Sequence, residues 1–221
     1  MQIKVSKLLY PVLSMGPGRR IDIVLQGCSI ASGGNPCYKC FSKDLWDANG
    51  GDSLDVDKVI KDVTEIIVGS ELSGVTITGG EPTDQHEQLL LLLRGIKDRL
   101  LESNYPIEVD YLLFSWFYEK QFALRFSDLY LELDALVLGP YQYEKSQEQP
   151  LIATSNQELI LNSNLARARY SDLSDMPRLD FAVSALDNSL LFIGMSHKDE
   201  MDKIKTMLSM RGIKLDYNSW E

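Results

Sequence analysis

The chain has 221 residues, of which 44% are hydrophobic and 24% charged, a length and composition that suit one soluble α/β domain or one domain with an appendage. A net charge of −10, with no basic cluster longer than Arg19-Arg20, argues against a nucleic-acid surface. No apolar run approaches the roughly 20 residues that span a bilayer, and the first residues lack the features of a signal peptide. We therefore expect a cytoplasmic protein that binds neither membrane nor nucleic acid.

Hydrophobic periodicity predicts strands and helices in alternation along the first 160 or so residues. The predicted strands are Gln2–Val12 (a first or edge strand), Ile21–Leu25, Val75–Thr78, Ile107–Phe114, Asp134–Leu138 and Gln157–Leu161. The predicted helices are Ser53–Val68, Gln85–Leu101 (capped by Thr83 or Asp84) and Tyr118–Phe126. Alternation at this period is typical of a parallel sheet, whose chemistry lies at the carboxyl ends of the strands.

The composition of the sequence changes near Asn162, where a polar stretch follows the last predicted strand of the core. Two strands, Asp180–Ala185 and Ser189–Gly194, separated by a turn at Leu186-Asp187-Asn188, precede an amphipathic helix over Asp199–Met210. We therefore divide the chain into a core domain over residues 1–162 and, over residues 163–221, a linker with a small ββα appendage.

All three cysteines of the chain, Cys28, Cys37 and Cys40, lie within thirteen positions in a loop that follows the predicted strand Ile21–Leu25. A disulfide between two of the cysteines would leave the third thiol unpaired. A closed zinc site would need a fourth ligand, and neither His86 nor His197 is near the cysteines in sequence. Three thiolates on a [4Fe–4S] cluster would leave one iron open to a small molecule. The spacing favours a catalytic iron–sulfur site over zinc or a loop without metal. Glycine, serine, asparagine and proline in Ser29–Pro36 predict a loop without regular structure.

A second motif, Gly79-Gly80-Glu81-Pro82, follows the predicted strand Val75–Thr78. The two glycines let the backbone approach a ligand closely, Pro82 fixes the turn, and Glu81 supplies either negative charge or a structural brace. Glycine pairs after strands are common, so the motif is informative only in combination with the cysteine loop.

With these segments in order, the chain resembles the radical S-adenosylmethionine (SAM) proteins, and among them the small activating proteins of anaerobic ribonucleotide reductase. The resemblance rests on GPGRRIDIVLQGC (residues 16–28), CYKCFSKDLW (37–46), GVTITGGEPTDQ (74–85), LDALVLGPY (133–141) and ATSNQELI (153–160). It implies an incomplete (β/α) barrel, open on one side, and cleavage of SAM to methionine and a 5′-deoxyadenosyl radical that abstracts hydrogen from a substrate. An open barrel exposes the radical unless a partner covers it, so we expect a protein or peptide substrate.

The resemblance also implies a role for particular residues. Cys28, Cys37 and Cys40 would each ligate an iron of the [4Fe–4S] cluster, and no catalytic residue is implied beyond the cluster and SAM. Cofactor-binding roles fall to Gly79, Gly80, Glu81 and Pro82 around the methionyl group, Phe41 near the cluster or adenine, Gln26 and Gly27 in the turn into the loop, and Ser115 near the ribose, where Asn156 is a second candidate. The electron would come from a donor such as flavodoxin or ferredoxin, in a low-oxygen host.

The chain departs from the family pattern at the cysteine loop. Eight residues separate Cys28 from Cys37, whereas the family usually has three. Longer surface loops cost little entropy, so the cluster is compatible with the insertion, which changes the face that a substrate approaches. Three functions therefore compete: an activase that installs a glycyl radical on a large enzyme, a radical SAM enzyme acting on another peptide or small molecule, and a non-catalytic iron–sulfur or zinc module.

Overall fold

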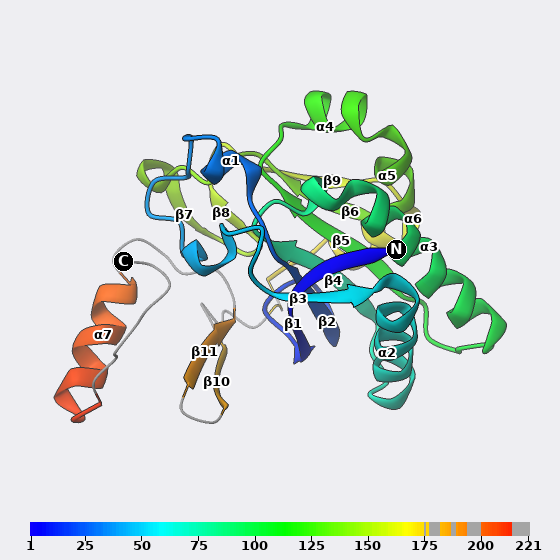
Figure 1. The fold of residues 1–221 in the computed structure, drawn as a ribbon, viewed down its shortest axis with the longest axis horizontal. Coiled ribbons are helices and arrows are strands. Elements are labelled where there is room, and N and C mark those ends of the chain that lie inside the picture. Colours follow the sequence, from blue (N-terminus) through cyan, green and yellow to red (C-terminus); the bar gives the residue numbers. More distant parts are fainter. Residues whose placement is uncertain (175, 177–181, 187–188, 194–199, 214–221) are drawn as a thin grey trace.

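The structure is a computed structural model that describes residues 1–174, 176, 182–186, 189–193 and 200–213. Its centre is a seven-stranded sheet with the order β3-β1-β2-β4-β5-β6-β9 (Figure 1). The strands of this sheet are β1 (Gln2–Val12), β2 (Arg20–Leu25), β3 (Asp52–Asp55), β4 (Gly74–Gly79), β5 (Asp110–Ser115), β6 (Ala135–Leu138) and β9 (Glu158–Leu161). The four inner strands β2, β4, β5 and β6 run parallel, whereas β1, β3 and β9 pair antiparallel with their neighbours. The fold is thus mixed α/β with a mostly parallel central sheet.

Helices cover one face of this sheet. They are α2 (Val56–Gly69), α3 (His86–Glu102), α4 (Glu119–Arg125) and α5 (Ser127–Glu132). Because side chains alternate along a strand, Ile21, Ile23 and Leu25 of β2 share the helix-side core with Val59 of α2 and Leu89 of α3. This alternation places Asp22 and the other even-numbered residues of β2 on the opposite face.

The opposite face has its own, smaller core. Leu112 and Val137 of the sheet pack there with Leu151, with Ala166 of α6 (Asn164–Arg169), and with Tyr170. Residues 164–170, which the predicted domain boundary assigns to the appendage, therefore pack against the central sheet. The boundary itself stays a prediction.

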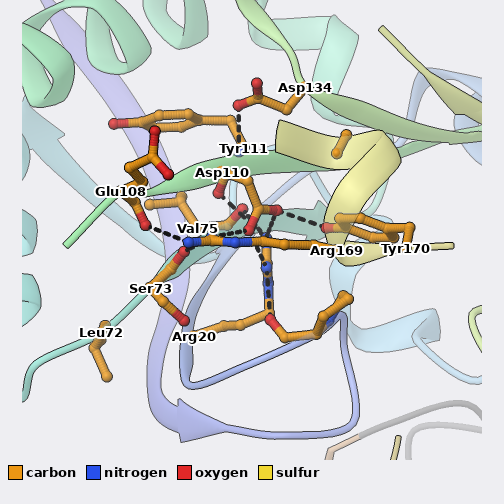
Figure 2. A network of polar contacts seen from close by, with 12 residues as sticks. Arg20, Leu72, Ser73, Val75, Glu108, Asp110, Tyr111, Asp134, Arg169 and Tyr170 are labelled. Atoms are coloured by element: carbon orange, nitrogen blue, oxygen red, sulfur yellow. Dashed lines mark hydrogen bonds and ion pairs between the residues drawn. The ribbon is translucent and has the colours of Figure 1, made fainter. Parts of the chain in front are cut away.

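A buried polar network ties this segment to the start of the parallel strands (Figure 2). Arg20 and Asp110 form an ion pair of 2.9 Å in which both side chains are 0% exposed. Arg169 adds a second ion pair of 2.7 Å to the Asp110 carboxylate, and the Tyr170 hydroxyl donates to it at 2.6 Å. Burial alone would raise the pKa of Asp110, but the Arg20 charge and these hydrogen bonds hold it below the usual value. The buried Asp110 carboxylate therefore depends on Arg20, Arg169 and Tyr170 for its hydrogen bonds and for its balancing positive charge.

A second buried carboxyl, that of Asp22, has fewer partners. The Thr78 hydroxyl donates to it at 2.7 Å. Burial raises the pKa of Asp22 to about 7, although the bond from Thr78 and the charge of Arg20 act in the other direction. Ionising this group in the folded state therefore costs free energy.

We expect the substitution Asp22→Asn to stabilise the protein at alkaline pH. The pKa is higher in the folded than in the unfolded state, so the wild-type protein loses stability as the pH rises from about 4 to about 7, by at most about 4 kcal/mol, whereas the amide does not ionise. The difference in melting temperature between variant and wild type should therefore grow between pH 5 and pH 8. A difference that does not change with pH would contradict the raised pKa.

Several elements differ from the sequence-based expectation. The strand Gln2–Val12 is not at the edge, because β3 pairs with its outer side, and the predicted helix Ser53–Val68 begins only at Val56, after that strand. The hairpin of β7 (Ser146–Gln149) and β8 (Ile152–Thr154) and the helix α5 were not predicted. The last strand predicted in the core, Gln157–Leu161, is present as β9 but pairs antiparallel with β6.

In the C-terminal part, the described residues contain the predicted elements as an antiparallel hairpin of β10 (Ala182–Leu186) and β11 (Ser189–Ile193) and a helix α7 (Glu200–Met210). The turn residues Asp187 and Asn188 lie outside the described residues. Among the helices of the described ranges, none has the length and apolar character needed to cross a membrane.

Candidate functional site

The cysteine loop leaves the sheet at the carboxyl end of β2, beside the carboxyl end of its parallel neighbour β4. Cys28 is the N-cap of a one-turn helix, α1 (Ser29–Ser32), so Ser29–Pro36 is not wholly irregular as the sequence predicts. Local backbone bonds explain the turn, since Ser32 and Gly33 donate to the carbonyls of Cys28 and Ser29. Cys28, Cys37 and Cys40 are all free thiols of intermediate burial.

The surroundings of the thiols suit metal-bound sulfur. Burial raises the pKa of Cys28, while backbone hydrogen bonds from Ala31 and Ile30 lower it. Burial, together with the charge of Cys40, raises the pKa of Cys37 to about 11, against a backbone bond from Tyr141. Without a cation these thiols stay protonated at neutral pH, and a bound metal removes their protons. Backbone donors aimed at sulfur are also a feature that tunes iron–sulfur clusters.

Free thiols in one loop with such donors fit the [4Fe–4S] ligand set that the sequence predicts. On a cubane cluster each thiolate binds a different iron, so the sulfur atoms need not converge on one point. In the parts of the chain that the structure describes, no three His, Cys, Asp or Glu side chains are gathered closely enough to hold a single metal ion.

The base of the cysteine loop is bonded to the glycine loop. The Gly80 N–H donates to the Leu25 carbonyl at 3.1 Å, and the Glu81 N–H donates to the Gly27 carbonyl at 2.9 Å. Gly27 adopts φ +102°, in the left-handed region that favours glycine. Since these N–H groups are occupied, the backbone groups that the glycine loop could still offer to a ligand are carbonyl oxygens, which would suit a donor such as an ammonium group.

Gln26 closes the other side of the cysteine loop. Its side-chain amide donates to the carbonyls of Asp44 and Asp47 at 3.0 and 2.9 Å, and the side chain is buried. Gln26 therefore holds the returning end of the loop in place. This position fits the predicted role of Gln26 in shaping the turn into the cysteine loop.

Glu81 is the polar centre of the glycine loop. Its carboxylate, 2% exposed, accepts hydrogen bonds from the Thr83 N–H and hydroxyl, from Ser115 Oγ at 2.9 Å and from the Trp116 N–H at 2.8 Å. Burial raises the pKa of Glu81, and these bonds lower it in part. Glu81 is thus a brace between the ends of β4 and β5, and Ser115 reaches the site through it. Pro82 is buried at the first position of the short 3-10 helix η2 (Pro82–Gln85).

Asp84 has a role that the sequence does not suggest. Its carboxylate accepts from the Ser29 N–H at 2.6 Å and from the Ser29 hydroxyl at 2.5 Å. The expectation that Thr83 or Asp84 caps the long helix is wrong, because the N-cap of α3 is Gln85 and Asp84 instead holds the first residue of α1. No local pattern reveals a bond between residues 55 positions apart.

Aromatic side chains after β6 meet the far end of the cysteine loop. Phe41 packs against Tyr141 with ring centroids 5.4 Å apart, and Tyr38 packs edge-on against Tyr143 at 5.8 Å. The ammonium of Lys39 lies 4.8 Å from the Tyr143 ring centre, within reach of a cation–π interaction. The sequence predicts Phe41 at the site, whereas Tyr141 and Tyr143 were missed because they come from a segment about 100 residues away.

This side of the site also carries unpaired polar atoms. Within the described residues, Tyr141 Oη, Thr154 Oγ1 and Asn156 Oδ1 are buried without a hydrogen-bond partner. The Ser146 side chain is near enough to lower the pKa of Tyr141, though outside hydrogen-bond geometry, and burial raises that pKa more strongly. The Asn156 side chain is fixed by its donation to the Pro140 carbonyl at 2.8 Å. Buried polar atoms left unpaired are costly, so they favour a polar ligand at this edge.

A substitution at Gly80 tests whether the cysteine loop and the glycine loop depend on their contact with each other. An added Cβ would stand 2.0 Å from the Gly27 carbonyl oxygen and 2.9 Å from that of Leu45, so even alanine displaces the backbone next to Cys28. We expect Gly80→Ala to lower iron incorporation as well as ligand binding, each by at least about tenfold, by analogy with overpacking at a rigid backbone contact. Iron analysis after reconstitution checks this. Gly34→Ala is the control, because nothing lies within 4 Å of its added Cβ. Wild-type iron content in Gly80→Ala would contradict the junction.

The comparisons with known proteins agree with this geometry. Residues 14–160, more than half of the chain, match the family model of the 4Fe-4S single cluster domain. The chain belongs to this family, which supports an iron–sulfur cluster on the cysteine loop.

Its relatives are activating proteins. The anaerobic ribonucleoside-triphosphate reductase-activating protein of Enterobacteria phage T4 is 22% identical over 151 residues, which cover 67% of this chain and 88% of that protein. The pyruvate formate-lyase 1-activating enzyme of Escherichia coli K12 is 34% identical over 74 residues, 33% of this chain and 28% of that enzyme. The corresponding enzyme of Clostridium pasteurianum is 31% identical over 86 residues, 38% and 34% of the two chains. These matches confirm the predicted resemblance to activating proteins.

Proposed function

We propose that this chain is a radical SAM activase that abstracts a hydrogen atom from a protein partner, a glycyl radical enzyme. The observation that carries the proposal is the junction of the two loops, because the Glu81 N–H bonds the residue next to Cys28. A cluster on the three thiolates and a small molecule on the glycine loop would therefore be neighbours. The relatives named above, each an activating protein of another enzyme, support the same proposal.

The residues divide the work as follows. Cys28, Cys37 and Cys40 would hold three irons of a [4Fe–4S] cluster. The carbonyl oxygens of Gly79 and Gly80, over the buried Glu81 carboxylate, would accept the methionyl ammonium of SAM. Asn156 Oδ1 and Tyr141 Oη are unpaired acceptor and hydroxyl groups for the adenosyl part. When bound, the cluster and SAM together supply one-electron reductive cleavage and a carbon radical able to take hydrogen from the substrate.

The protein contributes binding, orientation and exclusion of water. Phe41 packs against Tyr141, whose backbone bonds Cys37, so these two rings would limit solvent access to one side of a cluster. We also propose that the parallel strands β2, β4, β5 and β6 form an incomplete (β/α) barrel whose open side admits a macromolecular substrate. The electron would come from a donor such as flavodoxin or ferredoxin.

The proposal is tested by anaerobic reconstitution with iron and sulfide, followed by dithionite and SAM, with chromatography of 5′-deoxyadenosine. We expect about four irons per chain and formation of 5′-deoxyadenosine. Zinc in place of iron, or an intact cluster that never cleaves SAM with reductant present, would contradict it and favour a non-catalytic module. Abstraction of a hydrogen atom from the anaerobic reductase of phage T4, which would leave a glycyl radical detectable by electron paramagnetic resonance, would identify the partner class.

A further inference from the structure

We propose that Asp22 holds the substrate by accepting a hydrogen bond from a backbone N–H of the residue that loses its hydrogen atom. The inference rests on the proposed function and adds to it a residue that recognises peptide backbone. Asp22 lies in the middle of β2, six residues before Cys28, in a run that otherwise carries apolar side chains from Ile21 to Leu25.

The first step is the direction of the side chain. Ile21 and Ile23 belong to the core under the helices, so alternation turns Asp22 to the opposite face of the sheet. There it meets Thr78, whose hydroxyl donates to Asp22 Oδ1 at 2.7 Å. Thr78 is the residue directly before Gly79, so the carboxyl lies immediately below the glycine loop.

The second step is the change in burial along this face. Towards the start of the strands the face is filled, since Arg20, Thr76 and Asp110 are all 0% exposed. Towards the carboxyl ends it is only half-buried, at Thr78 of β4 and Phe114 of β5. Asp22 is 3% exposed, and Val24 beyond it on the same face of β2 is also buried, so the carboxyl faces the partly exposed region from the side, across Thr78 of the neighbouring strand.

The third step is the missing partner. In the described part of the chain, Asp22 makes no ion pair, and Thr78 is the only donor to its carboxyl. Arg20, two residues away on the same face, has all three guanidinium nitrogens bonded to Thr76, Pro17, Val75 and Asp110. A buried carboxyl with one hydrogen bond is costly, so a donor arriving with a ligand would stabilise it.

The chemistry favours a neutral donor. The positive charge of Arg20 is close enough to lower the pKa of Asp22, so the protein already supplies part of the stabilisation of the ionised carboxylate. Burial acts more strongly and raises that pKa to about 7, so at neutral pH both the neutral and the ionised forms are present, and each keeps an oxygen that accepts a hydrogen bond. A neutral amide N–H can donate to either form. A polypeptide that enters from the carboxyl ends of the strands presents such groups on both sides of every α-carbon.

N-acetylglycinamide deuterated at the α-carbon is the probe, because it is a small molecule with an amide N–H on each side of a glycine α-carbon. In the reconstituted protein with dithionite and SAM, a deuterium atom moves from the α-carbon of the probe to C5′ of the 5′-deoxyadenosyl radical. The C–D bond of the probe breaks, a C–D bond forms at C5′, and the unpaired electron stays on the probe's α-carbon. Mass spectrometry then measures the deuterated fraction of the 5′-deoxyadenosine. This fraction is a ratio within one sample, so differences in cluster content cancel.

We expect wild-type protein to deuterate its 5′-deoxyadenosine in proportion to probe concentration, and Asp22→Leu to need at least about tenfold more probe for the same fraction, as loss of a hydrogen bond to a charged group implies. Asp22→Asn keeps a carbonyl acceptor of the same size and should lie between the two. Equal fractions in all three proteins, or no deuterated product from wild type, would overturn the role of Asp22. Absence of any 5′-deoxyadenosine, labelled or not, would instead overturn the proposed function.

Discussion

Replacing Cys37 by alanine is expected to abolish both the cluster and SAM cleavage. Cys37 is the thiol whose pKa burial raises to about 11, so in the folded protein its ionised form depends on a bound cation. With two thiolates left, a cubane would have only two protein ligands. Iron and sulfide analysis after reconstitution, with 5′-deoxyadenosine chromatography, measures the loss. Because Cys37 would be a direct ligand, we expect the loss to exceed the roughly hundredfold that removing an outer-shell partner of a ligand can cost.

The control is Asn35→Ala in the same loop. Asn35 is exposed, and its backbone N–H, which the substitution keeps, donates to the Ile30 carbonyl. This variant should reconstitute like the wild type, which separates loss of a ligand from general damage to the loop. Normal iron content in the Cys37→Ala protein would contradict the assignment of Cys37 as a cluster ligand.

Replacing Arg20 by methionine is expected to destabilise the fold by about 3 kcal/mol, the lower end of the usual cost of removing one partner of a buried ion pair, because Arg169 and Tyr170 still bond the Asp110 carboxylate. Arg20 and Asp110 are each 0% exposed, so no solvent would replace the lost guanidinium at the carboxylate. In a chain of this size the melting temperature should fall by roughly 10 °C. Thermal unfolding followed by circular dichroism at pH 7 makes the measurement.

An exposed ion pair provides the comparison. Lys61 and Glu65 are 3.8 Å apart with side chains 60% and 67% exposed, and exposed pairs contribute at most about 1 kcal/mol. Lys61→Met should therefore leave the melting temperature nearly unchanged. If Arg20→Met also melts like the wild type, the network of Figure 2 does not hold the segment after α6 to the sheet.

The parts of the fold that sequence predicts well are those whose pattern is local. The apolar run in β2 and the helical spacing in α2 each identify an element without knowledge of its neighbours. The strand β3 has the polar sequence DSLD and pairs with β1 only because the chain returns there after the cysteine loop. The antiparallel direction of β9 depends likewise on the hairpin before it, since alternation of strands and helices carries no signal for it.

The candidate site divides in the same way. Three cysteines and the motif from Gly79 to Pro82 are readable because their residue types are rare or conformationally special. The partners that place them are not readable, since Glu81 meets Ser115 and Trp116 across 34 and 35 positions. Asp22 is hidden for another reason: a single acidic residue in an apolar run resembles the alternation of an ordinary half-exposed strand, and only the structure shows that both faces of β2 are buried.

The cysteine loop is five residues longer between Cys28 and Cys37 than the family pattern, and the beginning of this loop is held by hydrogen bonds. Asp84 holds Ser29 with both carboxylate oxygens, and the Asp84 N–H itself donates to the Glu81 carbonyl at 3.1 Å. Cys28 is therefore tied to the glycine loop from both sides, through Gly27 before it and Ser29 after it. The longer part of the loop follows these two anchored residues and includes residues 33–36, which are all exposed. Length and sequence in that outer arc can thus vary while the spacing between the first cysteine and the glycine loop stays constant.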